Sequence, residues 1–368
     1  MSKRKLLSGF AAIAAASALA LTGCGRDSGD SGSGDGGSGD KGGFSADAKI
    51  GVSLPQKTSE NWVLAENLFN KDLKDAGFKP TVQFANNGAS EQQNQIDAMI
   101  TSGVKVLVVG AVDGKQLNSQ LQRAKDEGIT VIAYDRMLTN SKNVDYYIAY
   151  DNYKVGELQG DALLQGLEER KGDGPYNIEL VAGSPDDANA TPFFEGAMSK
   201  LEPKIKDGTL KILSGQKEFS KVATQGWDPK NVQSRMDTIL SAKYGSESLD
   251  GVLSPNDTLA RAALVSAKNA GQEVPVVTGQ DSEVESLKSI LAGNQYSTIN
   301  KDTTNLVTQT VKMVTDLQKG EDIKEATDKT NNEVKDVPTE YLDPVLVTKE
   351  NIKDAYKNDE SLNKIVNP

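Results

Sequence analysis

From about residue 49 onward, short apolar runs alternate with longer amphipathic segments. Runs rich in Val and Ile predict buried strands, and segments with apolar residues every three or four positions predict helices. The predicted strands are 50–54, 82–85, 104–109, 130–134, 146–150, 178–182, 210–214, 251–253, 274–278 and 296–299. The predicted helices include 61–76, 230–242, 257–270 and 304–319. This alternation predicts an α/β fold with parallel sheets covered by helices on both faces.

The ends of two predicted helices carry their own signals. Gly77 follows the first helix, and glycine is the usual residue just past a helix end. The segment Ser90-Glu91-Gln92-Gln93 has the pattern of a capping box that opens the next helix, which is expected to stop at Gly103.

The strand–helix pattern restarts near residue 150, and a region of roughly 320 residues exceeds one comfortable hydrophobic core. We therefore predict two similar lobes, each a doubly wound parallel sheet, with a ligand cleft between them. The helix at 304–319 follows the last strand of the second lobe and is expected to return to the first. The first lobe is predicted at 47–150 plus 302–337, and the second at 151–301 plus 338–368.

The N-terminal segment indicates export. Lys3, Arg4 and Lys5 precede a short, Ala- and Ser-rich apolar run, which is typical of a secretory signal and is short for a membrane-spanning helix, the alternative. The next residues, LTGC, resemble the bacterial lipobox, which implies cleavage before Cys24 and attachment of diacylglycerol to its sulfur. We expect a signal peptide at 1–23, a flexible Gly/Ser/Asp-rich linker at 24–46, and an extracytoplasmic protein anchored by lipid to the outer face of the cytoplasmic membrane.

Composition excludes several classes of function. The chain has no histidine, which excludes histidine-based triads and His-containing zinc sites. Cys24 is the only cysteine, so the mature chain has no thiol left for catalysis, metal binding or an internal disulfide. Loss of the signal removes three basic and no acidic residues and changes the net charge from −11 to −14, which argues against nucleic acid or an anionic membrane surface as partner.

Polar and aromatic side chains follow nearly every predicted strand at its carboxyl end, where ligands bind in α/β sheets. Planar polar groups exchange hydrogen bonds with sugar hydroxyls, and aromatic rings stack on the C–H faces of a pyranose. These side chains lie in the segments Ser59–Trp62, Asp135-Arg136, Ser184–Asn189, Gly226–Asp228, Asn256-Asp257, Gly279–Asp281 and Asn300-Lys301. Their joint appearance favours one binding site.

Taken singly, most of these residues have simpler explanations. Asp135 and Arg136 could form a surface salt bridge, and Trp227 could be a core residue. Asn256 could cap a helix, and Asp186 and Asp187 could be acids at a helix start. Lys301 could be a solvated charge.

The motifs VIAYDR, GSPDDAN, WDP, SPND, TGQD and YSTINKD together resemble the substrate-binding proteins of bacterial ABC sugar importers, in the group of ribose, glucose/galactose and xylose binders with the type I periplasmic binding protein fold. The resemblance covers nearly everything from Lys49 on and is greatest to xylose- and multiple-monosaccharide-binding members. It implies lobes joined by a three-segment hinge near 149–152, 300–302 and 337–343. They would close over a monosaccharide and deliver it to a membrane permease. We expect a monomer with no cofactor and no metal.

The resemblance also implies roles for individual residues. Asp135 and Arg136 match a pair that holds sugar hydroxyls and the ring oxygen, and Trp62 and Trp227 match aromatics that stack on the two sugar faces. The other matching polar positions are Asn189, Asn256, Asp281 and Lys301. Asn61 departs from the family, because many xylose-type and multiple-sugar members have arginine there, and this bears on which sugar is preferred.

Three other classes of function share parts of this pattern. Sugar-responsive repressors share the two-lobed architecture, but a signal and lipobox stand where they carry a DNA-binding segment. A glycosidase could use Asp135 and Asp281 as its carboxylate pair, although Arg136 and Lys301 are expected to keep both acids ionised. A sensor that presents bound sugar to a membrane receptor would use the same site as a transporter component.

Overall fold

The computed structural model describes residues 43–57, 59–86 and 88–368. The expected signal peptide, Cys24 and most of the expected linker lie outside the described residues. The predicted end of the linker at residue 46 is wrong, because Phe44 already packs on the first lobe. Its backbone N donates to Gln318 O at 3.1 Å, and its ring centroid lies 6.3 Å from that of Phe78.

The first lobe is built on a seven-stranded sheet in the order β11-β12-β5-β4-β3-β1-β2. All neighbours are parallel except β11 and β12. The strands are β1 (Lys49–Leu54), β2 (Lys79–Phe84), β3 (Val106–Val109), β4 (Thr130–Tyr134), β5 (Tyr146–Tyr150), β11 (Asp328–Asn331) and β12 (Asp336–Leu342). The sequence pattern did not indicate β11, which has no apolar residue, or β12, whose apolar residues are interrupted by Pro338, Thr339 and Glu340.

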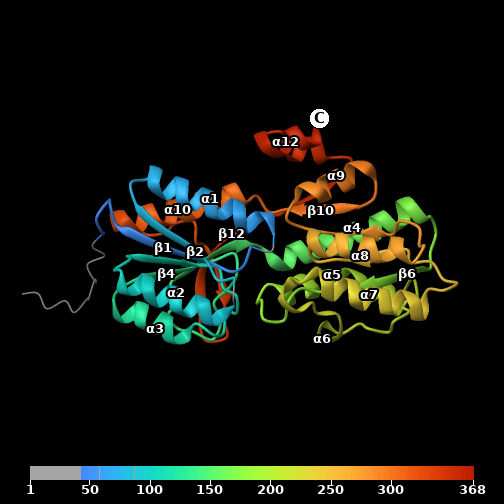
Figure 1. The fold of residues 1–368 in the computed structure, drawn as a ribbon, viewed down its shortest axis with the longest axis horizontal. Coiled ribbons are helices and arrows are strands. Elements are labelled where there is room, and N and C mark those ends of the chain that lie inside the picture. The colour runs from blue at the N-terminus through green and yellow to red at the C-terminus, as the bar shows by residue number, and fades with distance from the viewer. Residues whose placement is uncertain (1–42, 58, 87) are drawn as a thin grey trace, which may run out of the picture. The chain divides into compact units, whose positions relative to one another are not determined.

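Helices cover both faces of this sheet (Figure 1). They are α1 (Glu60–Asp75) and α10 (Thr303–Lys319) on one face, and α2 (Ala89–Thr101) and α3 (Asn118–Asp126) on the other. The packing of α10 against α1 confirms that the chain returns to the first lobe. The predicted capping box is wrong. Gly88, with a φ of 94°, is the N-cap of α2, so Ser90 already lies inside the helix.

The second lobe contains a four-stranded parallel sheet in the order β7-β6-β8-β9. Its strands are β6 (Tyr176–Leu180), β7 (Leu210–Lys211), β8 (Gly251–Leu253) and β9 (Val276–Val277). Its helices are α4 (Asn152–Lys171), α5 (Ala190–Lys206), α6 (Phe219–Val222), α7 (Pro229–Lys243), α8 (Asp257–Asn269), α9 (Val284–Ala292), α11 (Ile352–Ala355) and α12 (Glu360–Val366).

The strand predicted at 296–299 exists as β10 (Ser297–Asn300), and backbone hydrogen bonds from Tyr296 N to Val277 O and from Ile299 N to Gly279 O tie it to the end of β9. It pairs antiparallel with β13 (Val345–Thr348), because the chain leaving the first lobe runs back alongside it.

The chain passes from the first sheet into the second lobe after β5 and again after β12. Pairing between β12 and β5 continues as far as Leu342 and Tyr150. The predicted boundary between residues 337 and 338 therefore cuts through a strand, and the strand pairing moves it beyond Leu342. The rest of the predicted division into lobes stays a prediction.

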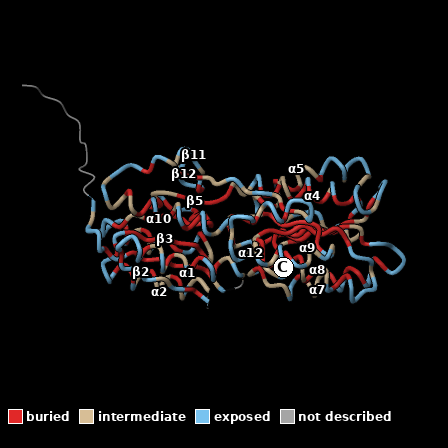
Figure 2. Tube along the Cα trace, turned by 90° about the horizontal axis from the view of Figure 1, so that it is seen from above, coloured by how far each residue is buried: buried red, intermediate tan, exposed pale blue. Residues whose placement is uncertain are grey.

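Apolar strand residues fill the interior of each lobe, as Figure 2 shows by burial. The carboxyl ends of these buried strands place the polar side chains that follow them.

Candidate functional site

The residues that follow β4 turn sharply away from the strand. Asp135 has a φ of 59°, a left-handed conformation that Asp adopts more readily than most residues. Its backbone N donates to Ile148 O, and its carbonyl O accepts from Tyr147 Oη and Asn189 Nδ2, each at 2.9 Å. The turn is therefore held from the first lobe by a neighbouring strand and from the second by Asn189.

Asp135 and Arg136 do not form a surface salt bridge. Their exposed fractions are 8% and 6%, and each has its ionic partner elsewhere. Arg136 Nε lies 2.9 Å from Asp187 Oδ2, and Asp135 Oδ2 lies 3.7 Å from Lys301 Nζ. The simpler explanation of the pair is wrong, because both side chains enter the interior.

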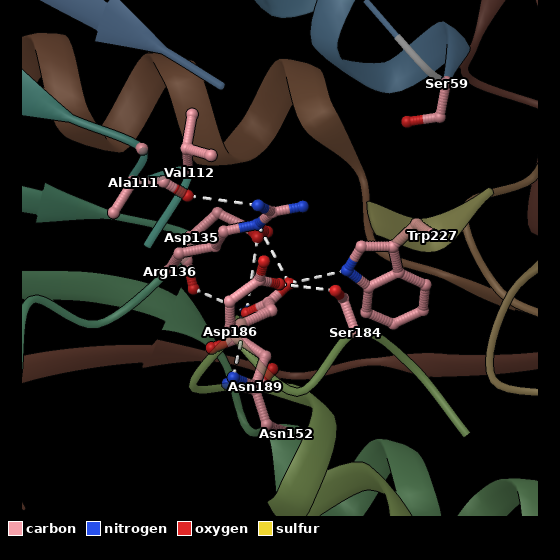
Figure 3. Close-up of polar contacts among 12 residues, drawn as sticks. Ser59, Ala111, Val112, Asp135, Arg136, Asn152, Ser184, Asp186, Asn189 and Trp227 are labelled. Atoms are coloured by element: carbon pink, nitrogen blue, oxygen red, sulfur yellow. Dashed lines mark hydrogen bonds and ion pairs between the residues drawn. The ribbon is translucent and has the colours of Figure 1, made fainter. Parts of the chain in front are cut away.

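Asp187 connects the two lobes at this point. Its Oδ2 accepts from Arg136 Nε and from Trp227 Nε1 at 3.0 Å, while its Oδ1 accepts from the backbone N of Asn189. Arg136 Nη1 also donates to Ala111 O at 3.0 Å. Figure 3 shows Arg136 and Trp227 facing one another across this cluster. The result is a buried carboxylate with an ionic partner and two further donors.

Lys301 occupies the middle of a second buried charge cluster. Its Nζ lies 3.3 Å from Asp281 Oδ1 and 3.7 Å from Asp135 Oδ2. Burial lowers the pKa of Lys301, but the two carboxylates together raise it above its usual value. The ammonium is therefore charged, and the long distances leave its hydrogen-bonding capacity only partly used.

Both tryptophans are at once core residues and cavity residues. Trp62 is 4% exposed, meets Tyr134 edge-on, and has the Arg136 guanidinium 5.4 Å from its ring centroid. Trp227 is 7% exposed and packs so closely on Gly183 that a Cβ there would lie 2.2 Å from the indole. The core explanation for Trp227 and its predicted place in the site are therefore compatible.

Three amides complete the predicted set. Asn256 Oδ1 caps α8 by accepting from Leu259 N, so the helix-cap explanation is correct, yet the residue also lines the cavity. Asn189 precedes α5 and contacts Asp135 instead of capping its helix. Asn61 accepts a hydrogen bond from Ser59 Oγ.

One cavity brings the predicted residues together. All nine line it, and so do Ser59, Asp187, Phe193, Thr258 and Gln280, which were not predicted as site residues. Its free space is only about 30 Å³, room for roughly two ordered waters. Gln280 Oε1 is buried there without a hydrogen-bond partner, so the cavity wall still offers an unused acceptor.

Asp187 is the main residue that the sequence-based prediction assigned wrongly. It had been explained as a helix-start acid. Its Oδ1 does accept from the backbone N of Asn189, but its Oδ2 binds Arg136 and Trp227. The only signal was its place in the GSPDDAN motif, at the end of a strand.

Burial raises the pKa values of two acids in the site. It raises the pKa of Asp281, an effect that the nearby Lys301 ammonium opposes, and it raises the pKa of Asp187 against the pull of Arg136. Lys301 and Arg136 therefore offset only part of the effect of burial on the pKa of Asp281.

These shifts predict how stability depends on pH. The raised pKa values of Asp187, Asp257, Asp281 and Glu283, each caused first by burial, mean that the folded protein binds more protons than the unfolded chain above about pH 4. Stability should therefore rise as the pH falls from 7.5 to 5, with no histidine to oppose it.

The measurement is the unfolding midpoint of the ligand-free protein against pH, for the wild type and Asp281→Asn. The variant should show a shallower slope, because one acid with a raised pKa is gone. A midpoint that falls on acidification over this range would contradict the shifts.

Within residues 43–57, 59–86 and 88–368, no three or more His, Cys, Asp or Glu side chains gather in a way that could hold a metal ion. In the same part of the chain, no helix combines the length and the apolar character needed to cross a bilayer.

Two α/β lobes that meet at a polar, tryptophan-lined cavity define a binding protein for a small polar ligand. The profile of the periplasmic binding protein domain matches residues 50–322, so this chain belongs to that family.

Its relatives include the multiple sugar-binding periplasmic receptor ChvE of Rhizobium radiobacter, which is 47% identical over 315 residues, 84% of this chain and 89% of the relative. The D-xylose-binding periplasmic protein of Escherichia coli is 36% identical over 314 residues, 85% and 90% of the two chains.

Solved structures agree with this membership. An ABC transporter solute-binding protein from Clostridium phytofermentans, with bound β-D-glucose, matches with a TM-score of 0.81 and 37% identity over 86% of this chain and 99% of its own. A carbohydrate transporter solute-binding protein from Chloroflexus aurantiacus, in complex with D-glucose, matches with a TM-score of 0.76 and 31% identity over 84% and 95%.

Proposed function

We propose that this protein binds a monosaccharide, an aldopyranose such as xylose, glucose, galactose or arabinose, outside the cytoplasm and delivers it to an ABC-type permease. One observation carries the proposal. The nine residues singled out as sugar ligands come from both lobes and line a single cavity. The relatives named for sugar binding and the glucose-bound structures support the same ligand class.

The chemistry of the cavity fits a polyhydroxylated ring. Asp135, Asp281 and Lys301 supply charged hydrogen-bonding groups, which are stronger in a site closed to water. Trp62 and Trp227 offer apolar surface to the ring's C–H faces. Two carboxylates beside one ammonium give this group a net negative charge. Such a group suits the neutral hydroxyls of a sugar better than a phosphate or a carboxylate ligand.

A thermal-shift screen against monosaccharides tests the proposal. A ligand that binds only the folded state stabilises it by RT ln(1 + [L]/Kd), about 4 kcal/mol at a thousandfold excess over Kd. One or more aldopyranoses should raise the unfolding midpoint clearly. If no monosaccharide shifts it, the proposed function is wrong.

Binding is proposed to proceed by closure of the lobes. The cavity residues of both lobes are nearly buried, with exposed fractions of 8% at Asp135, 3% at Asn189 and 7% at Trp227, so the lobes have to separate for the ligand to reach them. Glu60 joins the lobes outside the cavity: its Oε2 accepts from Val284 N at the start of α9 at 3.0 Å. A carboxylate is favourable at a helix N-terminus, so this contact stabilises the closed arrangement.

Removing this contact should speed sugar release. Because Glu60 is exposed, Glu60→Gln should raise the dissociation rate only about two- to fivefold, with little change in the association rate. Stopped-flow kinetics measures both rates. Glu66→Gln, on the same helix but paired with Lys57, is the matched control and should leave them unchanged. Equal dissociation rates in Glu60→Gln and the wild type would show that this contact does not stabilise the closed arrangement.

Membrane attachment through Cys24 is part of the proposal. Cys24→Ala should block lipid transfer, because no other thiol exists in the chain, and leave the protein in the medium or as uncleaved precursor. Membrane fractionation with an immunoblot measures this. A variant found in membranes in its normally processed form would contradict the lipid anchor.

A sugar sensor for a membrane receptor remains the second candidate, because it would use the same cavity. Catalysis is disfavoured by the family, whose relatives are described as binding proteins. Release of nitrophenol from nitrophenyl glycosides would overturn that assignment.

A further inference from the structure

The loop from Gly279 to Glu283 carries Asp281 to the cavity in an unusual backbone conformation. Asp281 has a φ of 90° and Ser282 a φ of 56°, so two consecutive residues with side chains lie in the left-handed region. Such residues persist only where the surroundings hold them. Gln280, next to them, has its side chain in the cavity wall.

A single carboxylate holds this loop from behind. Asp257 Oδ2 accepts from the backbone N of Glu283 at 3.0 Å and from Thr298 Oγ1 at 3.0 Å. Its backbone N donates to Gln280 O at 3.0 Å. Asp257 therefore binds the main chain on both sides of Asp281.

The other oxygen of Asp257 ties the loop to β10. Oδ1 accepts from Gln295 Nε2 at 2.8 Å, and Gln295 also donates to Ser297 O at 3.0 Å. A Cβ at Gly279 would lie 2.1 Å from Oδ1, so the loop backbone is packed directly on this carboxylate. Thr298 Oγ1 in turn accepts from Ser282 N at 3.3 Å.

Asp257 itself is fully buried and does not line the cavity, although Asn256 and Thr258 on either side of it do. Its sequence position suggested an ordinary acid in the first turn of a helix. Its contacts point across to the neighbouring loop, to the residues around Asp281.

We infer that Asp257 is a positioning residue: its carboxylate holds the 279–283 loop in the conformation that presents Asp281, and thereby Lys301, to the ligand. The inference rests on the proposed sugar binding. It predicts that Asp257 sets the affinity for sugar without touching it, through the loop that it anchors.

The test is calorimetric measurement of sugar affinity for Asp257→Ala, using the aldopyranose that gives the largest thermal shift with wild-type protein. Loss of the acceptors for Glu283 N and Thr298 Oγ1 should weaken binding about 10- to 30-fold. Thr298→Val removes, at nearly constant volume, both the donor to Asp257 Oδ2 and the acceptor for Ser282 N, and it should weaken binding about threefold to tenfold. It keeps the inference testable if Asp257→Ala does not fold.

Asp250→Ala is the matched control. Asp250 directly precedes β8 and accepts from Asn177 N and Ser248 Oγ, so it ties loops together at the end of the strand away from the cavity. Its loss should lower the unfolding midpoint but leave sugar affinity unchanged. A merely structural role for Asp257 predicts the same outcome for Asp257→Ala, and that result would overturn the inference.

A double-mutant cycle between Asp257 and Asp281 tests whether Asp257 acts on sugar affinity through Asp281. If Asp257 acts through Asp281, then Asp281→Ala should cost far less affinity when Asp257 is already alanine than in the wild type. If the affinity loss of the double variant equals the product of the two single losses, positioning through this loop is contradicted. Failure of the wild type to bind any monosaccharide would instead reject the proposed function, so the two failures are distinct.

Discussion

Arg136→Ala should weaken sugar binding about 30-fold or more, because a charged hydrogen-bonding partner is lost from a closed site. Arg136 also neutralises the buried Asp187 carboxylate, donates to Ala111 O and lies over the Trp62 ring. Removing one partner of a buried ion pair typically costs about 3–5 kcal/mol, so the variant should also unfold at a lower temperature. Isothermal titration below that temperature measures the affinity.

Arg123→Ala is the control for this experiment. Arg123 pairs with Asp97 at 2.6 Å on a solvent-exposed face of the same lobe, so its loss should leave the affinity unchanged and the stability nearly so. An Arg136→Ala variant with wild-type affinity would show that the buried cluster supports the fold and not the ligand.

The second large effect is expected for Trp227→Ala. The indole is nearly buried among core residues of the second lobe and donates to Asp187, so truncation should cost about 3–5 kcal/mol of stability. The same indole lines the cavity, and loss of its contact area should weaken binding by roughly 2–3 kcal/mol, about 30- to 150-fold. Chemical denaturation and calorimetry measure the two effects separately.

Trp227→Phe separates the ring from its N–H group. It retains an aromatic face for the sugar but removes the donor to Asp187 Oδ2, so it should retain more affinity than the alanine variant. A destabilised Trp227→Ala that still binds as tightly as the wild type would return Trp227 to a purely structural role.

The strand pattern predicted which strand ends carry the residues that line the cavity. The run 130–134 reads as a buried strand because every residue is apolar or β-branched, and the polar pair that follows it must then lie at a sheet edge. That reasoning alone left a surface salt bridge open. The joint appearance of polar residues at several strand ends favoured a shared site, and Asp135 and Arg136 do line one cavity.

The partners themselves were not predictable in the same way. Arg136 binds Asp187 instead of Asp135, and Asp187 stands on a loop of the other lobe. Such pairings depend on how the two lobes meet, which local periodicity does not encode. The role of Asp257 was hidden for the same reason, because an acid in the first turn of a helix already has a sufficient local explanation.

Errors in the fold had similar causes. β13 was not predicted as a strand, because its partner, β10, lies in a distant part of the chain. The linker prediction overlooked Phe44 because the surrounding residues are small and polar, whereas one aromatic ring is enough to bring that segment onto the core.

Tryptophan emission tests the central claim most directly, because the chain has only two tryptophans and both line the cavity. Wild-type protein is titrated with D-xylose, D-glucose and D-galactose, and with the open-chain polyol sorbitol as control. The account predicts a saturable change in emission with at least one aldopyranose and none with sorbitol. Emission that stays constant while calorimetry detects sugar binding would place the ligand elsewhere and contradict the account.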